Sequence, residues 1–464
     1  MEFFPIPFLL SIVLLLSASS SSSSTTVTLP LTVFPSLPFT HPWKNIKHLV
    51  SASLTRAQHL KTPRIKSNTS IQNVALFPRS YGAYSISLAF GTPPQSLSLV
   101  FDTGSSLVWF PCTAGYRCSN CSFPNVDAAT IPKFIPKLSS SAKIIGCRNR
   151  KCSWIFGPNL KSLCRSCSPR SRKCSDTCPG YGIQYGSGAT AGFLLSETLD
   201  FPEKRVPDFL VGCSVVSVHQ PAGIAGFGRG PESLPSQMGL KRFSHCLVPR
   251  QFDDSPVSSP LVLDSSSESG ESKNNSLIYA PFRENPSGSN AAFREYYYLT
   301  LRRILIGRKP VKFPYKYLVP NSAGNGGAII DSGSTFTFLD KPIFEAVAEE
   351  LEKQLVKYPR AKGVEAESGL RPCFDISKEE SVEFPELILK FKGGATLALP
   401  PANYLALVTD TGVVCLTMIT DVTFLGGGGG PAIIFGAFQQ QNVLVQYDLA
   451  KDRIGFRKQR CTVN

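Results

Sequence analysis

Two segments of this chain share one pattern, and that repeat constrains the fold more than any other feature of the sequence. Residues 101–109 read FDTGSSLVW, and residues 330–338 read IDSGSTFTF. In each segment an apolar stretch leads to an acid, which is followed by a hydroxyl residue, a glycine and a second hydroxyl residue. Glycine permits the tight turn that presents a carboxylate at a strand end, and the hydroxyls can orient that carboxylate by hydrogen bonding.

A second pattern follows each copy of the first. Residues 222–226 (AGIAG) and 432–436 (AIIFG) are apolar segments that end in glycine, and they stand at comparable distances after the two acids. A single Asp-Thr-Gly triplet occurs in ordinary turns. The paired motifs with their paired followers predict two related halves, each presenting one acid.

The residues around the first motif alternate with a period of two. Residues 84–90 alternate between polar and apolar, residues 91–94 (GTPP) form a turn signal, and residues 96–101 alternate again. This pattern predicts a β-hairpin. Helical periodicity is scarce, and residues 341–356, with Pro342 near the start, are the best helix candidate. We therefore expect a mostly β chain, and 464 residues suffice for two large units.

The net charge of +15 is concentrated in two places. Residues 25–79 contain seven basic residues and no acid, and residues 112–178 contain twelve Lys or Arg and two acids. A nucleic-acid-binding fold would spread its cations along a reading surface with interleaved aromatic residues. We therefore expect no nucleic-acid partner.

The N-terminus reads as a segment for export. Residues 3–16 are apolar but too short for a bilayer span, which needs about 20 residues, and small residues follow them. This predicts a signal peptide over residues 1–24, although no Lys or Arg precedes the apolar run. A short membrane anchor or a buried segment is the alternative. The basic residues 25–79 then form a removable prosegment, and we expect no stable membrane insertion of the mature protein.

Fourteen cysteines are present, and nine of them crowd into residues 112–178. The pairs Cys118/Cys121 and Cys164/Cys167 have a spacing that is also typical of zinc sites. In an exported chain disulfides are the default, so we expect disulfides, no metal and no other cofactor, with a connectivity that the sequence leaves open. The cysteines of this insertion are Cys112, Cys118, Cys121, Cys147, Cys152, Cys164, Cys167, Cys174 and Cys178.

Three Asn-x-Ser sequences, at Asn68, Asn120 and Asn274, predict glycosylation.

The sequence gives little support for a hydrolase that uses a serine nucleophile or a zinc ion. Neither a G-x-S-x-G nor an H-E-x-x-H pattern occurs, and outside residues 25–79 the chain has two histidines, His219 and His245.

The paired motifs resemble those of the pepsin family of aspartic proteases. The cysteine-rich insertion and residues 434–442 (IFGAFQQQN) resemble the plant nepenthesin-like secreted group of that family. The similarity extends over about residues 81–461 and implies an all-β, bilobal fold with few short helices and an active site in the cleft between two related lobes. It divides the chain into an N-terminal lobe (80–250), an inter-lobe connection (251–295) and a C-terminal lobe (296–464).

By this resemblance Asp102 and Asp331 are the catalytic pair. Tyr185, followed by Gly186, corresponds to the tyrosine of a mobile flap, and Trp109 corresponds to the indole that steadies it. The rest of each motif supports the acids, with Thr103 and Ser332 bracing the two loops and Ser105 and Ser334 bonding the outer carboxylate oxygens beside Gly104 and Gly333.

The resemblance also pairs Cys373 with Cys415 and leaves Cys213, Cys246 and Cys461 unassigned. In one departure, Ala437 follows Gly436 where the family usually has Asp or Asn, which puts the rigidity of that loop in question.

The function that this implies is a secreted, monomeric aspartic endopeptidase, which hydrolyses peptide or protein substrates at acidic pH through a water activated by two aspartates. Extracellular space or cell wall is the expected location, with the vacuole as the alternative. The basic prosegment would pair with the acids at neutral pH and leave when they protonate. A catalytically inactive binding or inhibitor protein with the same bilobal fold is the rival interpretation, although neither acid motif is damaged.

Overall fold

The protein is described here by a computed structural model. It covers residues 26–33, 42–61, 84–121, 131–164, 176–185, 188–201, 204–218, 222–249, 258–265, 277–288, 291–408, 412–421 and 429–461. The expected signal peptide, Asn68, Asn274, Cys167, Cys174 and Gly186 lie outside these residues.

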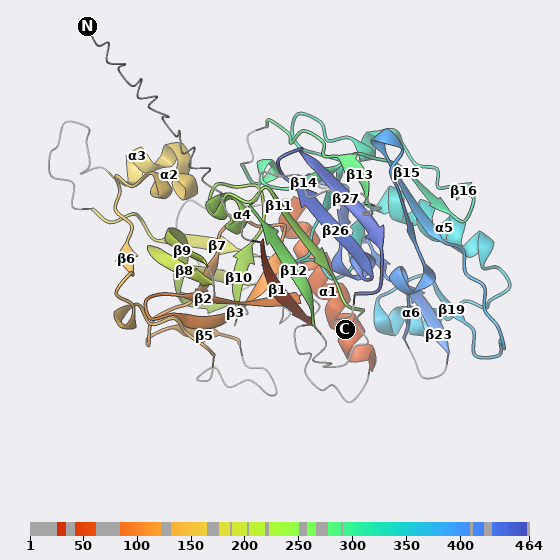
Figure 1. The fold of residues 1–464 in the computed structure, drawn as a ribbon. Coiled ribbons are helices and arrows are strands. Elements are labelled where there is room, and N and C mark those ends of the chain that lie inside the picture. Colours follow the sequence, from red (N-terminus) through yellow and green to blue (C-terminus); the bar gives the residue numbers. More distant parts are fainter. Residues whose placement is uncertain are drawn as a thin grey trace, which may run out of the picture.

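Two β-rich lobes lie on either side of a central group of strands (Figure 1). The N-terminal lobe contains strands β2 (Tyr84–Phe90), β3 (Gln95–Asp102), β4 (Trp109–Pro111), β5 (Arg117–Ser119), β6 (Lys143–Ile144), β7 (Tyr181–Gln184), β8 (Ala189–Phe201), β9 (Lys204–Val218) and β10 (Gly223–Gly226), with helices α2 (Arg150–Phe156), α3 (Leu160–Leu163) and α4 (Leu234–Met238). The predicted hairpin is the antiparallel pair β2 and β3.

The C-terminal lobe is built from smaller sheets. Its strands are β14 (Tyr297–Leu299), β15 (Leu301–Ile306), β16 (Lys309–Pro310), β17 (Ala328–Ile330), β18 (Thr337–Leu339), β19 (Cys373–Asp375), β20 (Leu387–Phe391), β21 (Thr396–Leu399), β22 (Leu405–Leu407), β23 (Val413–Leu416), β24 (Met418–Ile419) and β25 (Ile433–Phe435). The predicted helix is α5 (Lys341–Gln354), and α6 (Lys362–Ser368) follows it.

Short 3-10 helices connect several of these elements. They are η2 (Pro136–Leu138), η3 (Gly157–Asn159), η4 (Ala291–Arg294), η5 (Tyr315–Leu318), η6 (Lys392–Gly394), η7 (Pro401–Asn403) and η8 (Ala437–Gln440).

The two repeated patterns of the sequence form equivalent structures in the two lobes. The strand before each acid pairs in parallel with the apolar-glycine strand of the same lobe, β3 with β10 and β17 with β25. Each closing glycine lies against the backbone of the acid loop, because a Cβ on Gly226 would approach Ser106 O to 2.2 Å and one on Gly436 would approach Phe336 O to 2.7 Å. The follower strands therefore end in glycine so that the acid loops can pass beside them.

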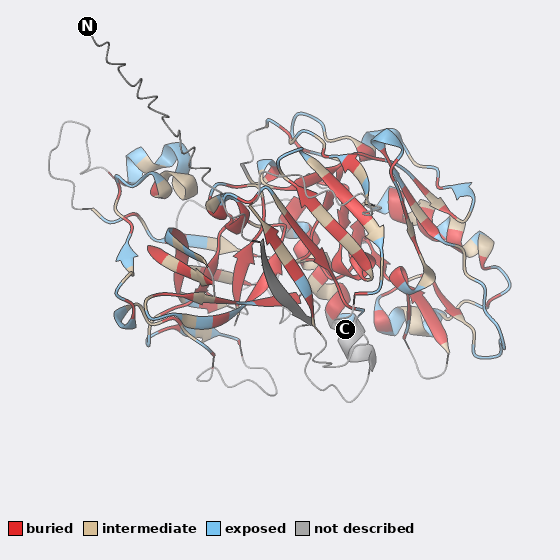
Figure 2. Cartoon of the chain, viewed as in Figure 1, coloured by how far each residue is buried: buried red, intermediate tan, exposed pale blue. Residues whose placement is uncertain are grey.

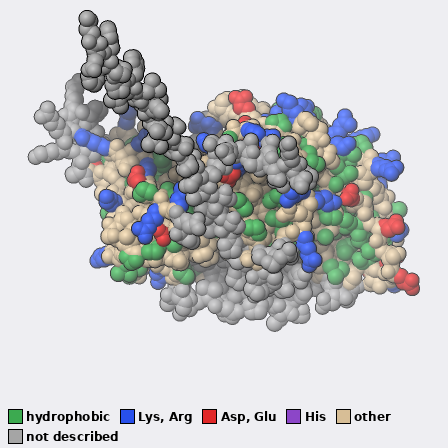
Figure 3. Space-filling view, viewed as in Figure 1, with side chains coloured by type: hydrophobic (Ala, Val, Ile, Leu, Met, Phe, Trp, Pro, Cys, Tyr) green, Lys and Arg blue, Asp and Glu red, His purple; other side chains and the backbone are tan. Residues whose placement is uncertain are grey.

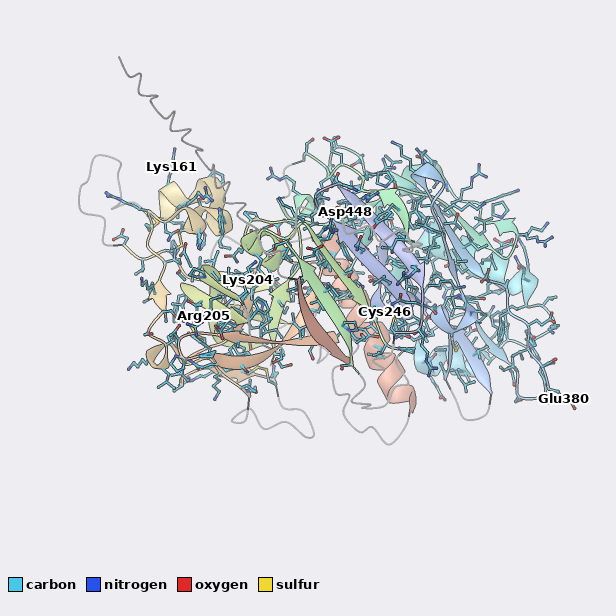
Figure 4. All side chains as sticks on the ribbon, viewed as in Figure 1. Lys161, Lys204, Arg205, Cys246, Glu380 and Asp448 are labelled. Carbon is cyan, nitrogen blue, oxygen red and sulfur yellow. A yellow bond between two sulfur atoms is a disulfide. The ribbon has the colours of Figure 1, made fainter. Side chains whose placement is uncertain are left out.

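Strands from both ends of the chain meet in the central sheet. Its order runs β13 (Ile278–Pro281), β27 (Arg453–Lys458), β26 (Val443–Asp448), β11 (Arg242–Cys246), β12 (Ser258–Asp264) and β1 (Thr26–Val33), and β1 continues into β2. The expected inter-lobe connection, residues 251–295, thus contributes β12 and β13 to the sheet. Figure 4 shows Cys246 and Asp448 in this central group, and Cys246 is bonded to Cys461 near the C-terminus.

The longest helix, α1 (Pro42–Lys61), is a feature that the sequence analysis did not anticipate. Its residues Leu49, Val50, Ala57 and Leu60 fall at helical spacing and are buried in one apolar cluster with residues of the C-terminal lobe. The helix lies between the lobes behind the central strands (Figure 1) and contacts β18, β24 and α6. Figure 2 shows the buried residues concentrated in the strands of both lobes and of the centre. No helix within the described ranges is long and apolar enough to cross a membrane.

Candidate active site

Asp102 and Asp331 come from different lobes and meet between them. Asp102 is the last residue of β3 and Asp331 directly follows β17, and their exposed fractions are 1% and 0%. The glycine of each motif lies against the opposite acid: a Cβ on Gly104 would stand 2.5 Å from Asp331 Oδ1, and one on Gly333 would stand 2.5 Å from Asp102 Oδ1. No other residue type fits at these two positions while the carboxylates face each other.

The hydroxyls after the acids join the two loops. The Thr103 N–H donates to Ser332 Oγ at 3.0 Å, and the Ser332 N–H donates to Thr103 Oγ1 at 2.9 Å. The Ser332 hydroxyl in turn donates to the carbonyl of Phe101 at 2.9 Å. Both side chains are fully buried, so this reciprocal pair fixes the separation of the two acids across the lobe boundary.

Each carboxylate is oriented by its own loop in the same way. For Asp102, the Gly104 N–H donates to Oδ1 at 2.9 Å and the Ser105 hydroxyl donates to Oδ2 at 2.5 Å. For Asp331, the donors are the Gly333 N–H at 2.9 Å and the Ser334 hydroxyl at 2.6 Å. The repeated motif is thus a repeated carboxylate holder.

Arg56 of helix α1 occupies the space between the two acids. Its Nη2 donates to Asp102 Oδ1 at 2.7 Å, and its Nε donates to Asp331 Oδ2 at 3.1 Å. The Arg56 side chain is buried with the acids. A guanidinium suits this position because its fixed fork of donors can satisfy two carboxylates at once.

Asp102, Asp331 and Arg56 shift one another's pKa values. Burial, opposed by Arg56 and reinforced by Asp331, raises the pKa of Asp102 to about 6. Burial would also raise the pKa of Asp331, but the charge and hydrogen bond of Arg56 hold it below the usual range. Burial alone would lower the pKa of Arg56, yet the two acids raise it above its ordinary value, so the guanidinium stays charged. With Arg56 bound, Asp102 is thus the acid that takes up a proton first.

Tyr185 lies at the end of the hairpin formed by β7 and β8. The Trp109 indole N–H donates to the Tyr185 hydroxyl at 2.6 Å, and both side chains are buried. Burial, followed by the nearby Asp102 carboxylate, raises the pKa of Tyr185 well above its usual range, so the phenol stays neutral. The structure therefore brings Trp109, Tyr185 and the acid pair into one site.

The loop that contains Ala437 is anchored without an Asp or Asn at that position. The Ala437 N–H donates to Ser334 O at 2.7 Å, and Ala437 itself is buried. The backbone thus supplies the connection to the second acid motif that the substitution had put in question.

All cysteines in the described parts of the chain are disulfide-bonded. The pairs are Cys112–Cys213, Cys118–Cys121, Cys147–Cys164, Cys152–Cys178, Cys246–Cys461 and Cys373–Cys415. Cys118 and Cys121, whose spacing is also typical of zinc sites, form one of these disulfides. Cys112 anchors the insertion to β9 through Cys213, which the sequence had left unassigned.

Sequence reasoning recognised the charge of residues 25–79 but missed the two side chains that use it. Besides Arg56, Lys61 donates to Asp340 Oδ1 at 2.6 Å and to Pro431 O at 2.8 Å. Both belong to α1, and both are buried. The signal that could have revealed this helix is the helical spacing of its apolar residues, Leu49, Val50, Ala57 and Leu60. A helix over these residues would have carried Arg56 and Lys61 to the C-terminal lobe.

Two family models match most of the chain. The one described as xylanase inhibitor N-terminal covers residues 84–263, and the one described as xylanase inhibitor C-terminal covers residues 296–458. Among solved structures, the one described as edgp superposes with a TM-score of 0.60 at 20% identity, covering 95% of this chain and 97% of that one. Basic 7S globulin from soybean gives 0.58 at 20% identity, covering 82% and 92%. These structures share the fold.

Curated relatives are more similar in sequence. A probable aspartyl protease of Arabidopsis thaliana is 32% identical over 432 residues, with 83% of each chain covered. Aspartic proteinase nepenthesin-1 of Nepenthes gracilis is 32% identical over 390 residues, covering 82% of this chain and 78% of that one. With two related lobes that each present one aspartate, this chain belongs to the pepsin-like aspartic protease family.

Proposed function

We propose that this chain is the precursor of a secreted plant aspartic endopeptidase that cleaves peptide bonds at acidic pH. The observation that carries the proposal is the acid pair: two buried aspartates from different lobes, each held by an N–H and a hydroxyl of its own loop, face one another. Two carboxylates this close cannot both ionise cheaply, so one proton is retained between them in acid.

With α1 removed, the space that Arg56 fills is open to a water and a peptide carbonyl. The ionised aspartate takes a proton from the water as it attacks the carbonyl carbon, and the protonated aspartate donates to the developing oxyanion. Ser105 and Ser334 keep the carboxylates oriented during this exchange. The hairpin of β7 and β8, with Tyr185 steadied by Trp109, would close over an extended peptide and exclude water.

In the precursor, α1 blocks this chemistry. Arg56 satisfies both acids, and the Ser53 hydroxyl accepts a hydrogen bond from the Phe336 N–H at 2.9 Å just beyond the second motif. Substrate and α1 therefore exclude each other. We infer that residues 25–79 are a prosegment that leaves after acidification.

Export, glycosylation and a monomeric state belong to the same proposal. Asn120 is exposed beside the Cys118–Cys121 disulfide, where a glycan would meet solvent. On the face drawn in Figure 3, the coloured Lys and Arg side chains are scattered among acids rather than gathered in one stripe. This face therefore lacks the stripe of cations that nucleic-acid binding would need there.

The rival is a non-catalytic binding or inhibitor protein, which the descriptions of the two matching family models favour. Such a protein would not need the reciprocal Thr103–Ser332 pair or a fully oriented carboxylate pair, and this chain has both. The test is hydrolysis of denatured globin from pH 2 to 8 by the acid-treated protein, with and without pepstatin.

We expect cleavage that is confined to acid, fails above about pH 6 as both acids ionise, and is abolished by pepstatin and by Asp102→Asn. Lys309→Gln, an exposed charge of the C-terminal lobe, serves as the control and leaves the rate unchanged. A processed, disulfide-bonded protein that cleaves at no pH would move the assignment to the inhibitor.

A further inference from the structure

A second pair of acids lies beside the first catalytic loop, and the proposed reaction does not use it. The two acids are Glu232 and Glu295, and Ser106 of the Asp102 loop lies next to both. Ser106 is buried, with 2% of its surface exposed. Ser106 Oγ accepts a hydrogen bond from the Gly230 N–H at 3.1 Å. A Cβ on Gly228 would stand 2.7 Å from this oxygen, and one on Gly230 would stand 2.6 Å from it. The loop after β10 is thus closed around one hydroxyl of the Asp102 motif.

Glu232 points to the same spot. Its side chain is 6% exposed, and the Cβ position of Gly230 that is 2.6 Å from Ser106 Oγ is also 2.8 Å from Glu232 Oε2. Within the described residues, Oε2 has no hydrogen-bond partner. A buried carboxylate oxygen without a donor is costly when charged and tolerable when protonated.

Glu295 reaches Ser106 from the other lobe. Its backbone carbonyl accepts the Arg229 N–H at 2.8 Å, and the Cβ position of Gly228 that is 2.7 Å from Ser106 Oγ is also 3.2 Å from this carbonyl oxygen. Its carboxyl interacts with the Ser106 side chain. Glu295 stands between η4 and β14, at the beginning of the C-terminal lobe. Ser106 therefore lies where the first catalytic loop, the loop after β10 and the start of the second lobe come together.

The neighbouring cations do not neutralise the pair. Arg229 is engaged with Asp452 at 2.7 Å and lies over the Phe282 and Tyr297 rings. Arg294 is exposed and only partly offsets the burial of Glu295. Tyr296, also buried, adds no positive charge.

The titration of both acids agrees with this geometry. Burial, and then the charge of Glu295, raise the pKa of Glu232 to about 8. Burial raises the pKa of Glu295, against the hydrogen bond from Ser106 and the charge of Arg294. Both directions favour a neutral pair through the acid range.

We propose that Glu232 and Glu295 form a protonated carboxyl pair that holds Ser106, and with it the Asp102 loop, against the beginning of the C-terminal lobe. When the pair ionises toward neutral pH, the charge of buried Glu232 and that of half-buried Glu295 repel each other, and the connection weakens. Glu232 and Glu295 are positioning residues, and their effect on catalysis rests on the proposed peptidase function.

The sign of the pH dependence follows from proton binding. The folded protein binds the Glu232 proton more tightly than the unfolded chain, so the free energy of unfolding falls as the pH rises. The fall begins near the ordinary glutamate pKa of 4.5 and levels off near 8. Over that range this one residue would raise the unfolding equilibrium constant by about a thousandfold.

The experiment measures urea unfolding of the full chain from pH 4 to 8 in an Asp331→Asn background, which prevents self-cleavage and leaves the Ser106 side untouched. We expect Glu232→Gln and Glu232→Leu to flatten the decline in stability with pH. Glu380→Gln, an exposed acid that Figure 4 labels at the far end of the C-terminal lobe, should leave it unchanged. An undiminished decline in a folded Glu232→Leu variant would overturn the proposal.

Glu295→Gln provides a second variant in case Glu232→Leu does not fold. Removing the neighbouring charge should move the decline to lower pH and make it smaller, and an unchanged curve would count against the pair. A chain that cleaves nothing fails as a peptidase, while its unfolding curve still tests the carboxyl pair.

Discussion

Thr103 and Ser332 show how much of the site depends on two hydroxyls that never touch a substrate. Each side-chain oxygen accepts the N–H of the other residue, across 229 positions of sequence and between two lobes. The acids beside them are held by similar donors, but those donors belong to the same loop as the acid. The reciprocal pair is therefore the connection that sets one carboxylate relative to the other.

Replacing Thr103 by Val should destabilise the protein by about 1–3 kcal/mol, because it leaves the buried Ser332 N–H without an acceptor. Thr103→Ser keeps the hydroxyl and is the matched control, for which we expect a much smaller loss. Urea unfolding at pH 5 in the Asp331→Asn background measures both. Equal stability of the Val and Thr proteins would show that the pair contributes nothing to the fold.

At the scale of elements, the sequence predicted what periodicity and repetition encode. The hairpin of β2 and β3, the helix α5 and the paired acid loops all follow from local patterns that appear twice or alternate cleanly. Helix α1 was not predicted because residues 25–79 were interpreted from their positive charge alone, as a basic prosegment. The helical spacing of their apolar residues was not used. Strand β12 was missed because it lies in a Ser-rich and Asp-rich stretch, and its pairing with β11 and β1 is a long-range contact.

The sequence also could not predict that Arg56 contacts the two acids. Seven basic residues occur in residues 25–79, and only the packing of α1 against β18, β24 and α6 selects which of them reaches Asp102 and Asp331. The buried Glu232 is similar, since an acid within a Gly-Pro-rich loop reads as exposed until the fold closes around it.

Helix α1 should inhibit the processed enzyme as a separate peptide. A peptide of residues 42–61 presents Arg56 and the apolar face to the vacated site. Arg56→Gln should weaken its inhibition about a hundredfold, because Asp331, which is still ionised at pH 5, loses its charged partner. Lys47 is exposed on the same helix, so Lys47→Gln is the control and should inhibit like the parent peptide. Inhibition constants at pH 5 decide the matter, and equal potency of the two variants would contradict the assigned role of Arg56.

At the scale of the whole molecule, β1 and α1 hold the two lobes and the centre together. Strand β1 pairs with β12 in the central sheet, Arg56 joins the acids of both lobes, and Lys61 joins Asp340 at the start of α5. Three contacts in three parts of the fold make removal of this segment a change of the entire molecule. Two of the contacts are ion pairs whose acids titrate, which makes the removal sensitive to pH.

Acid should release α1 in two stages. Asp102, with its pKa raised to about 6, is protonated first and gives up its charge toward Arg56. Asp331, with its pKa below the usual range, stabilises the contact above the ordinary aspartate value and loses it as the pH falls through the lowered pKa. Burial raises the pKa of Asp340 against the charge of Lys61, so this second ion pair also weakens in acid.

Amide hydrogen exchange of residues 42–61, measured within seconds of a drop from pH 7 to between 6 and 3, follows this release. We expect protection to decline from about pH 6 and to be lost only as the pH falls below the ordinary aspartate pKa of 3.8, where Asp331 also protonates. In the Arg56→Gln variant, α1 should be poorly protected already at pH 7. The ionised Asp102 and Asp331 then repel each other with no cation between them, so neutral pH does not increase the protection of the helix. Lys47→Gln should follow the parent protein. If α1 stays equally protected from pH 7 to 3, acid is not the trigger, and removal of the segment requires another protease.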